Sequence, residues 1–152
     1  MNQNIHENIR KQLIEMIGHI NVFWLEGRLY KITDCFDEKI NLSFLDLRNT
    51  CCNRQDCFEL MNKFIQTNRI IRFDEDNFVF DIIPGKVKAK CNFHMEFITD
   101  NVRQKKEGKD IFIFRKKRGK WIVEKRFFFF CWLLFFFKRV FYFLFFDLNH
   151  SF

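Results

Sequence analysis

The sequence predicts a single α+β domain in which a long N-terminal helix lies across one face of an antiparallel sheet. Up to about residue 24, apolar residues recur at intervals of three and four, which is typical of a one-sided helix. From about residue 70 the interval becomes two, which is typical of half-buried strands. The 152 residues are 48% hydrophobic and 30% charged, so the chain can bury one core and full disorder is excluded.

Three helices are expected in the first half of the chain. The first contains a single apolar stripe and is interrupted at Gly27, and a short second helix covers residues 29–36. Asn53 is expected to cap the third, with Asp56 in its positive first turn. The stripe of the first helix consists of Ile5, Ile9, Leu13, Met16, Ile17, Ile20 and Trp24.

The strands are expected to form a meander after one early strand over residues 39–45. Residues 74–77 interrupt the first long strand with a tight reversal or a bulge. In the second long strand, alternate residues from Val87 to Phe97 are apolar. The long strands are expected at residues 70–83, 86–99, 102–117 and 120–126, with turns at 84–85, 100–101 and 118–119.

The formal net charge of +7 is concentrated in one segment. Residues 103–126 contain 11 Lys and Arg residues but only Glu107, Asp110 and Glu124 as acids, a net charge of +8. Such a segment could meet phosphate, anionic lipid or an acidic protein. Residues 115–120 lie at a predicted hairpin tip without interleaved aromatic residues, so a solvated hairpin is favoured and nucleic-acid binding is not.

Three segments resemble the nuclear transport factor 2-like superfamily, which includes SnoaL-like cyclases and ketosteroid isomerases. They are residues 24–28 (WLEGR), residues 36–40 (FDEKI) and residues 108–123 (GKDIFIFRKKRGKWIV). The resemblance covers residues 4–126 and implies a cone-shaped curved antiparallel sheet wrapped around the long N-terminal helix, in the order α-α-β-α-β-β-β-β. It also implies a pocket at the wide end of the cone and dimerisation through the outer face of the sheet.

The resemblance also directs attention to two candidate catalytic residues, Asp46 and His94. In isomerase-like members a general-base Asp stands on the first strand, where this chain has Phe44, which cannot accept a proton. Asp46 lies two residues further and could substitute, although an exposed loop position is favoured. His94 lies in mid-strand and titrates near neutrality, but it would lie outside the cone if the apolar face points inward.

Candidate ligand-pocket residues are polar or aromatic groups within regular elements. Trp24 and Trp121 could stack on an aromatic ligand, although core packing is favoured for both. Tyr30, Arg72, Asp81 and Arg126 are polar groups in regular elements that could line the mouth of a pocket, but no spacing selects one of them. No metal-ligand spacing or cofactor motif is present in the sequence, so neither a metal nor a cofactor is expected. The candidate pocket residues are Trp24, Tyr30, Arg72 and Trp121.

The C-terminal segment, residues 127–152, contains 12 of the 24 Phe residues and is treated separately from the domain at residues 1–126. Residues 127–146 contain only Lys138 and Arg139 as charges, so the segment could anchor the protein in a membrane. A second interpretation is that residues 127–130 extend the last strand and the remainder packs on an apolar surface. A third is that the segment is an unselected extension of the reading frame.

The polar N-terminus lacks the apolar run of a signal peptide, which favours a cytoplasmic protein with free cysteine thiols. The sequence therefore favours a small, pocket-bearing binding or assembly domain, homodimeric through its sheet, that takes a small hydrophobic ligand and lacks a demonstrable catalytic site. One alternative is a cofactor-free SnoaL-like isomerase, cyclase or dehydratase. Another is a tail-anchored protein of the membrane surface.

Overall fold

The computed structural model describes residues 2–43, 50–51 and 53–130. It confirms the α+β fold class and, apart from an added two-residue strand at Thr50–Cys51, the predicted order of the elements. These are α1 (Asn2–Leu25), the 3-10 helix η1 (Leu29–Cys35), β1 (Phe36–Ser43), β2 (Thr50–Cys51), α2 (Arg54–Thr67), β3 (Arg69–Ile83), β4 (Lys86–Thr99), β5 (Val102–Lys117) and β6 (Lys120–Phe130).

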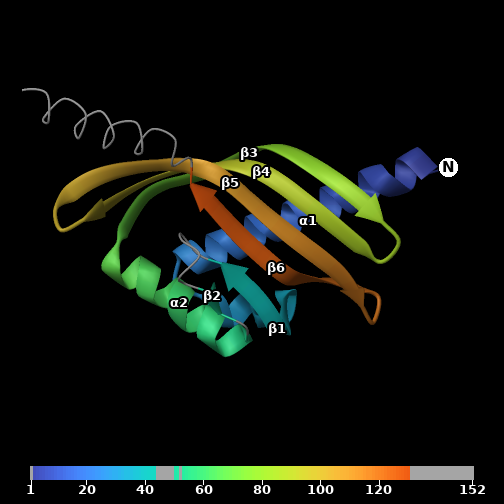
Figure 1. The fold of residues 1–152 in the computed structure, drawn as a ribbon, viewed down its shortest axis with the longest axis horizontal. Coiled ribbons are helices and arrows are strands. Elements are labelled where there is room, and N and C mark those ends of the chain that lie inside the picture. The colour runs from blue at the N-terminus through green and yellow to red at the C-terminus, as the bar shows by residue number, and fades with distance from the viewer. Residues whose placement is uncertain (1, 44–49, 52, 131–152) are drawn as a thin grey trace, which may run out of the picture.

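The six strands form one curved sheet in the order β2-β1-β6-β5-β4-β3. Neighbouring strands are antiparallel except β1 and β6, which run parallel. Helix α1 runs across one face of the long strands, and α2 lies beside the β1–β2 end of the sheet (Figure 1). The curved sheet and α1 together enclose the core, and we call the enclosed region the cone.

The apolar stripe of α1 is largely buried from Leu13 onward, whereas Ile5 at its start is 57% exposed. Leu13, Ile17 and Ile20 are each at most 1% exposed, and Trp24 is completely buried. The Trp24 Nε1–H group donates a hydrogen bond to the carbonyl oxygen of Met61 at 3.1 Å. This bond fixes the end of α1 against α2 while satisfying the polar atom of a buried indole.

The apolar face of β4 lines the cone. Alternate residues from Val87 to Phe97 are buried, whereas His94 and its neighbours of the same parity point to the outer face. On β5 the same alternation places Asp110, Phe112 and Phe114 inside the cone. A polar residue therefore occupies one of the inward positions of an otherwise apolar row.

Two local predictions about backbone geometry are confirmed. The backbone N–H of Asp56 donates to the Asn53 side chain at 2.9 Å, so Asn53 caps α2. The pairing of β3 with β4 shifts between Asp76 and Val79, and Asn77 has a φ of 54°, so a bulge at residues 77–78, which overlaps the predicted segment 74–77 at Asn77, lies within a continuous strand. Glu75 precedes this bulge and points into the cone.

Strand β6 continues to Phe130, so residues 127–130 belong to the sheet. Phe128 is 6% exposed and its ring lies 6.1 Å from that of Trp24. The remaining residues of the Phe-rich segment, 131–152, lie outside the described residues, and so do the interpretations that depend on them. Within the described ranges, no helix has the length and apolar character needed to cross a membrane.

The cysteines differ in part from the expectation of free thiols. Cys35 and Cys91 are free, whereas Cys57, at the start of α2 and completely buried, is disulfide-bonded. The sequence offered no signal for this bond, because cysteine pairing depends on which thiols the fold brings together.

Candidate functional site

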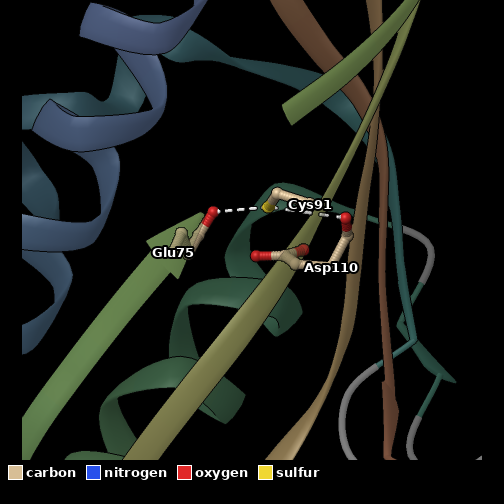
Figure 2. Close-up of side chains that lie close together, drawn as sticks. All are labelled: Glu75, Cys91 and Asp110. Carbon is tan, nitrogen blue, oxygen red and sulfur yellow. Dashed lines mark hydrogen bonds between the residues drawn. The ribbon is translucent and has the colours of Figure 1, made fainter. Parts of the chain in front are cut away.

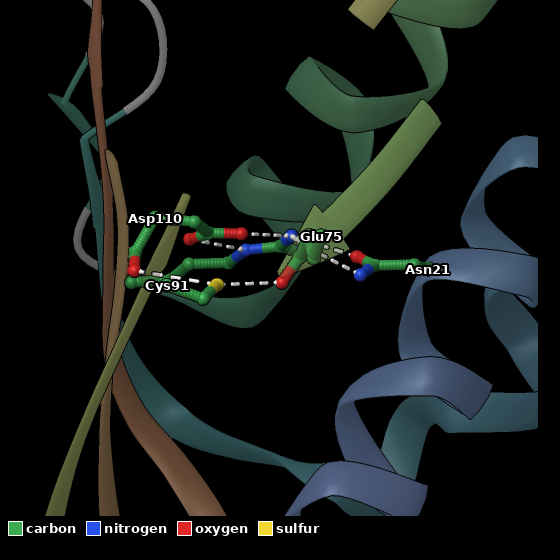
Figure 3. Close-up of polar contacts among 5 residues, drawn as sticks. Asn21, Glu75, Cys91 and Asp110 are labelled. Atoms are coloured by element: carbon green, nitrogen blue, oxygen red, sulfur yellow. Dashed lines mark hydrogen bonds and ion pairs between the residues drawn. The ribbon is translucent and has the colours of Figure 1, made fainter. Parts of the chain in front are cut away.

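Five polar side chains from five different elements meet inside the cone (Figure 3). Their side chains are nearly or completely buried, with exposures of 8% or less. Helix α1 contributes one, and the adjacent strands β3, β4, β5 and β6 contribute one each. They are Asn21, Glu75, Cys91, Asp110 and Arg126, and we call them the buried polar cluster.

The ion pair between Arg126 and Asp110 forms the centre of the cluster. Arg126 Nη2 lies 2.8 Å from Asp110 Oδ2 and Arg126 Nε lies 3.3 Å from Oδ1, so the contact is bidentate. Both side chains are completely buried. The guanidinium also lies over the rings of Phe112 and Phe128, at 4.4 and 4.3 Å from their centroids. Arg126 is therefore held by charge on one side and by aromatic faces on the other.

The other members of the buried polar cluster extend this pair across the cone. Arg126 Nη2 donates to Asn21 Oδ1 at 2.7 Å, and the Asn21 amide donates to Glu75 Oε1. The Cys91 thiol donates to Glu75 Oε2 at 2.8 Å and lies 3.7 Å from the carbonyl oxygen of Asp110 (Figure 2). Arg126 Nη1 is buried and has no hydrogen-bond partner among the described residues.

The charges of the buried polar cluster do not cancel, because two carboxyl groups face one guanidinium. Burial raises the pKa of Asp110; Arg126 opposes this shift and the negative charge of Glu75 adds to it. Burial, followed by the charge of Glu75, also raises the pKa of the Cys91 thiol. The thiol is therefore neutral, and Asp110 takes up a proton more readily than an exposed carboxyl group.

Glu75, Cys91 and Asp110 could in principle offer ligand atoms to a metal ion, since these atoms lie within 4.8 Å of one another. Two features disfavour a metal centre. The guanidinium of Arg126 already occupies both carboxylate oxygens of Asp110. In addition, a thiol must lose its proton to bind a metal, and the pKa of Cys91 is raised. The cluster is better described as an ion-pair network.

Of the two candidate catalytic residues, His94 lies within the described part of the chain. His94 lies on the outer face of β4, with Nε2 3.4 Å from Asp76 Oδ2 and Nδ1 3.2 Å from Glu107 Oε1. It therefore points away from the buried polar cluster. Asp46 lies outside the described residues.

The four candidate pocket residues are dispersed. Trp24 is part of the core and contacts the Arg126 guanidinium, 5.6 Å from its ring centroid. Trp121 is half-buried, with Lys116 Nζ 5.3 Å from its ring centroid. Tyr30 is 72% exposed on η1, and Arg72 is exposed and pairs with Asp74.

Sequence reasoning selected none of the five members of the buried polar cluster as site residues. A usable signal existed for two of them. Asp110 occupies an inward position of the row that contains Phe112 and Phe114, and Arg126 stands two residues before Phe128. Opposite charges at inward positions of neighbouring strands indicate a buried pair. No comparable signal identifies Glu75 or Asn21, because a bulge and a helix–strand contact position them.

An open groove lies outside the cone, between the first half of α1 and β3. Its volume is about 760 Å³. Strand β3 contributes Phe78, Val79 and Phe80, and α1 contributes Ile14. The rings of Phe78 and Phe80 stack at 6.2 Å. Charged residues of both signs surround the apolar part, namely Glu7, Arg10, Lys11 and Glu15.

The described architecture is shared with several solved structures. An NTF2-like protein with a cystatin-like fold from Novosphingobium aromaticivorans is 11% identical and has a TM-score of 0.69, with 84% of each chain covered. A second protein from that organism, provisionally named a scytalone dehydratase, is 12% identical with a TM-score of 0.72, covering 86% of this chain and 88% of the other. The chain has the nuclear transport factor 2-like (NTF2-like) fold.

A third structure with this NTF2-like fold is ActVI-ORFA from Streptomyces coelicolor. It is 10% identical and has a TM-score of 0.68, covering 82% of this chain and 98% of the other. No protein-family model and no curated protein matches the sequence. At these identities the likeness concerns the fold, and function has to be argued from this chain's own residues.

Proposed function

We propose that this NTF2-like chain is a non-catalytic binding module that takes a small hydrophobic ligand in the groove between α1 and β3. The observation that carries this proposal is the contrast between polar groups completely buried in the cone and an open apolar groove. A catalytic group has to touch its substrate. Asp110 and Arg126 are completely buried and bonded to each other, so they cannot do so in this conformation.

The groove has the properties of a ligand site. Its volume of about 760 Å³ falls within the range of small-molecule pockets. Phe78 and Phe80 on β3 and Ile14 on α1 provide its apolar part, and Ile14 is 42% exposed. Charged groups such as Arg10 and Glu15 could orient a polar end of the ligand. An amphipathic ligand with an apolar body suits this combination.

The proposal is tested by titrating the full chain with N-phenyl-1-naphthylamine, a neutral dye whose fluorescence rises in apolar sites. Ile14→Glu places a charge in the groove and is expected to weaken dye binding at least tenfold. Val22→Glu is the matched control, because Val22 is also an exposed aliphatic residue of α1 but does not line the groove. Val22→Glu is expected to bind the dye as the unsubstituted chain does.

Two results would contradict the proposal. Equal weakening by both substitutions would mean that the dye reports general surface hydrophobicity. A loss of binding in Asp110→Asn, with Ile14→Glu unaffected, would place the ligand inside the cone. That second result would favour the alternative of a SnoaL-like isomerase, cyclase or dehydratase.

The enzymatic alternative has one observation in its favour, which is an internal carboxyl group with a raised pKa. Asp110 would then be the acid–base group, rather than Asp46 or His94. Homodimerisation through the sheet and membrane attachment through residues 127–146 stay predictions, as does the cytoplasmic location.

A further inference from the structure

The outer face of β4, β5 and β6 combines exposed lysines with a pair of aromatic rings. Lys88 and Lys90 on β4, Lys109 on β5 and Lys125 on β6 are exposed, and none of them forms an ion pair with a described residue. Phe127 and Phe129 on β6 point to the same side. We call these six residues the basic–aromatic face.

The strand register brings the six residues into adjacent rows. Lys90 pairs with Ile111, which pairs with Phe127. Lys109 is directly opposite Phe129 in the next row. In the row on the other side of Ile111, Lys88 and Lys125 flank Ile113. Directly opposite residues share a face of the sheet, so positive charges surround the two rings.

The two rings form an accessible platform. The centroids of Phe127 and Phe129 are 6.2 Å apart with an interplanar angle of 29°, and Phe129 is 45% exposed. Aromatic side chains on an open antiparallel sheet can stack against unpaired bases, and neighbouring lysines can contact the phosphates between them. The chain supplies both groups on one surface.

We propose that the basic–aromatic face binds single-stranded nucleic acid. The charges argue against a second copy of the chain as the occupant, because two-fold packing would bring two copies of the same positively charged face together. An anionic partner removes that repulsion. The stacked rings distinguish a strand with exposed bases from a partner that offers charge alone.

The linear sequence did not favour nucleic acid because its most basic run, residues 115–120, contains no aromatic residue. The lysines of the basic–aromatic face are spread over three strands, and the sheet register brings Phe127 and Phe129 between them.

The proposal is tested by fluorescence anisotropy with the full chain and a labelled, mixed-sequence single-stranded RNA of 20 nucleotides. Phe129→Leu keeps an apolar side chain but removes the ring, and is expected to weaken binding roughly 5- to 150-fold. Phe129→Trp keeps a stacking surface and is expected to bind at least as well as the unsubstituted chain. Val22→Leu, at a 51% exposed position on α1, is the control and should have no effect.

The lysines are tested through the salt dependence of the same binding. Replacing Lys90 and Lys109 with Gln is expected to reduce the slope of log K against log salt by about 1.4, at about 0.7 per phosphate contact. Lys11→Gln combined with Lys63→Gln removes the same charge from α1 and α2. This control is expected to change the slope much less.

Three outcomes would overturn the proposal. The first is an absence of RNA binding at low salt. The second is binding that depends on the lysines but is the same in Phe129→Leu, which indicates a simple polyanion surface. The third is that the chain binds vesicles of phosphatidylcholine and phosphatidylserine through this face and does not bind RNA. Circular dichroism of every variant checks that the fold is retained.

Discussion

Among the described residues, two arginine–aspartate pairs join different strands, and they differ in where the fold places them. Arg126 and Asp110 lie in the buried polar cluster, and both side chains are completely buried. Arg115 and Asp37 lie where β5 passes the start of β1; Arg115 is 37% exposed and the Asp37 side chain 8%. The residue types are the same, but solvent reaches only the second pair.

Because the two carboxyl groups differ in burial, their pKa values are shifted in opposite directions. The pKa of Asp37 is lowered, first because its carboxylate accepts a hydrogen bond from the Lys39 backbone N–H at 3.0 Å, and then because of Arg115. The pKa of Asp110 is raised by burial, despite a bidentate arginine. For Asp110, at the centre of the cone, the effect of burial on the pKa therefore outweighs the attraction of the arginine. For Asp37, at the edge of the cone, it does not.

The largest expected effect comes from breaking the buried pair. Arg126→Met leaves Asp110 and Glu75 buried without their cation and is expected to lower the free energy of unfolding by about 3–5 kcal/mol. Urea denaturation measures the loss. Combining Arg126→Met with Asp110→Leu should restore much of the lost stability, because an apolar pair needs no opposite charge beside it. A loss in Arg126→Met below about 1 kcal/mol would mean that water enters the cone and screens the charges.

The opposite pKa directions predict opposite pH dependences of stability. Asp110 holds its proton more tightly in the folded state, so its contribution is complete below the unfolded pKa of about 3.9 and is lost as the pH rises through the folded value. Asp37 does the reverse: its contribution is present above about 3.9 and is lost as the pH falls through the folded value.

Urea denaturation between pH 3 and pH 9 compares the unsubstituted chain with Asp110→Asn and Asp37→Asn. The stability difference for Asp110→Asn should shrink as the pH rises, by at most about 1.4 kcal/mol per unit, and that for Asp37→Asn should shrink as the pH falls. A difference for Asp110→Asn that grows with pH would show that Arg126, and not burial, determines the charge of Asp110.

The smallest expected effect comes from breaking the partly exposed pair, Arg115 and Asp37. Arg115→Met is expected to cost about 1 kcal/mol or less, because solvent and the Lys39 N–H still stabilise the Asp37 carboxylate. Urea denaturation at pH 7 in low and high salt checks this value, and the effect should diminish in high salt. A cost equal to that of Arg126→Met would remove the distinction between the two pairs.

The sequence by itself determined the elements and the facing of most side chains, because both follow from local periodicity. The stripe of α1, the cap at Asn53 and the alternation along β4 each depend on neighbours within a few residues. It also directed attention to His94, but a single residue's spacing does not reveal which groups lie across the sheet.

Only the tertiary structure decided what lies inside the cone and on its outer face. The buried polar cluster joins Asn21 to Arg126, which are 105 positions apart in the chain. The basic–aromatic face depends on the register of three strands. Such contacts form only when distant segments bury a shared apolar core, and short-range pattern contains no information about that pairing.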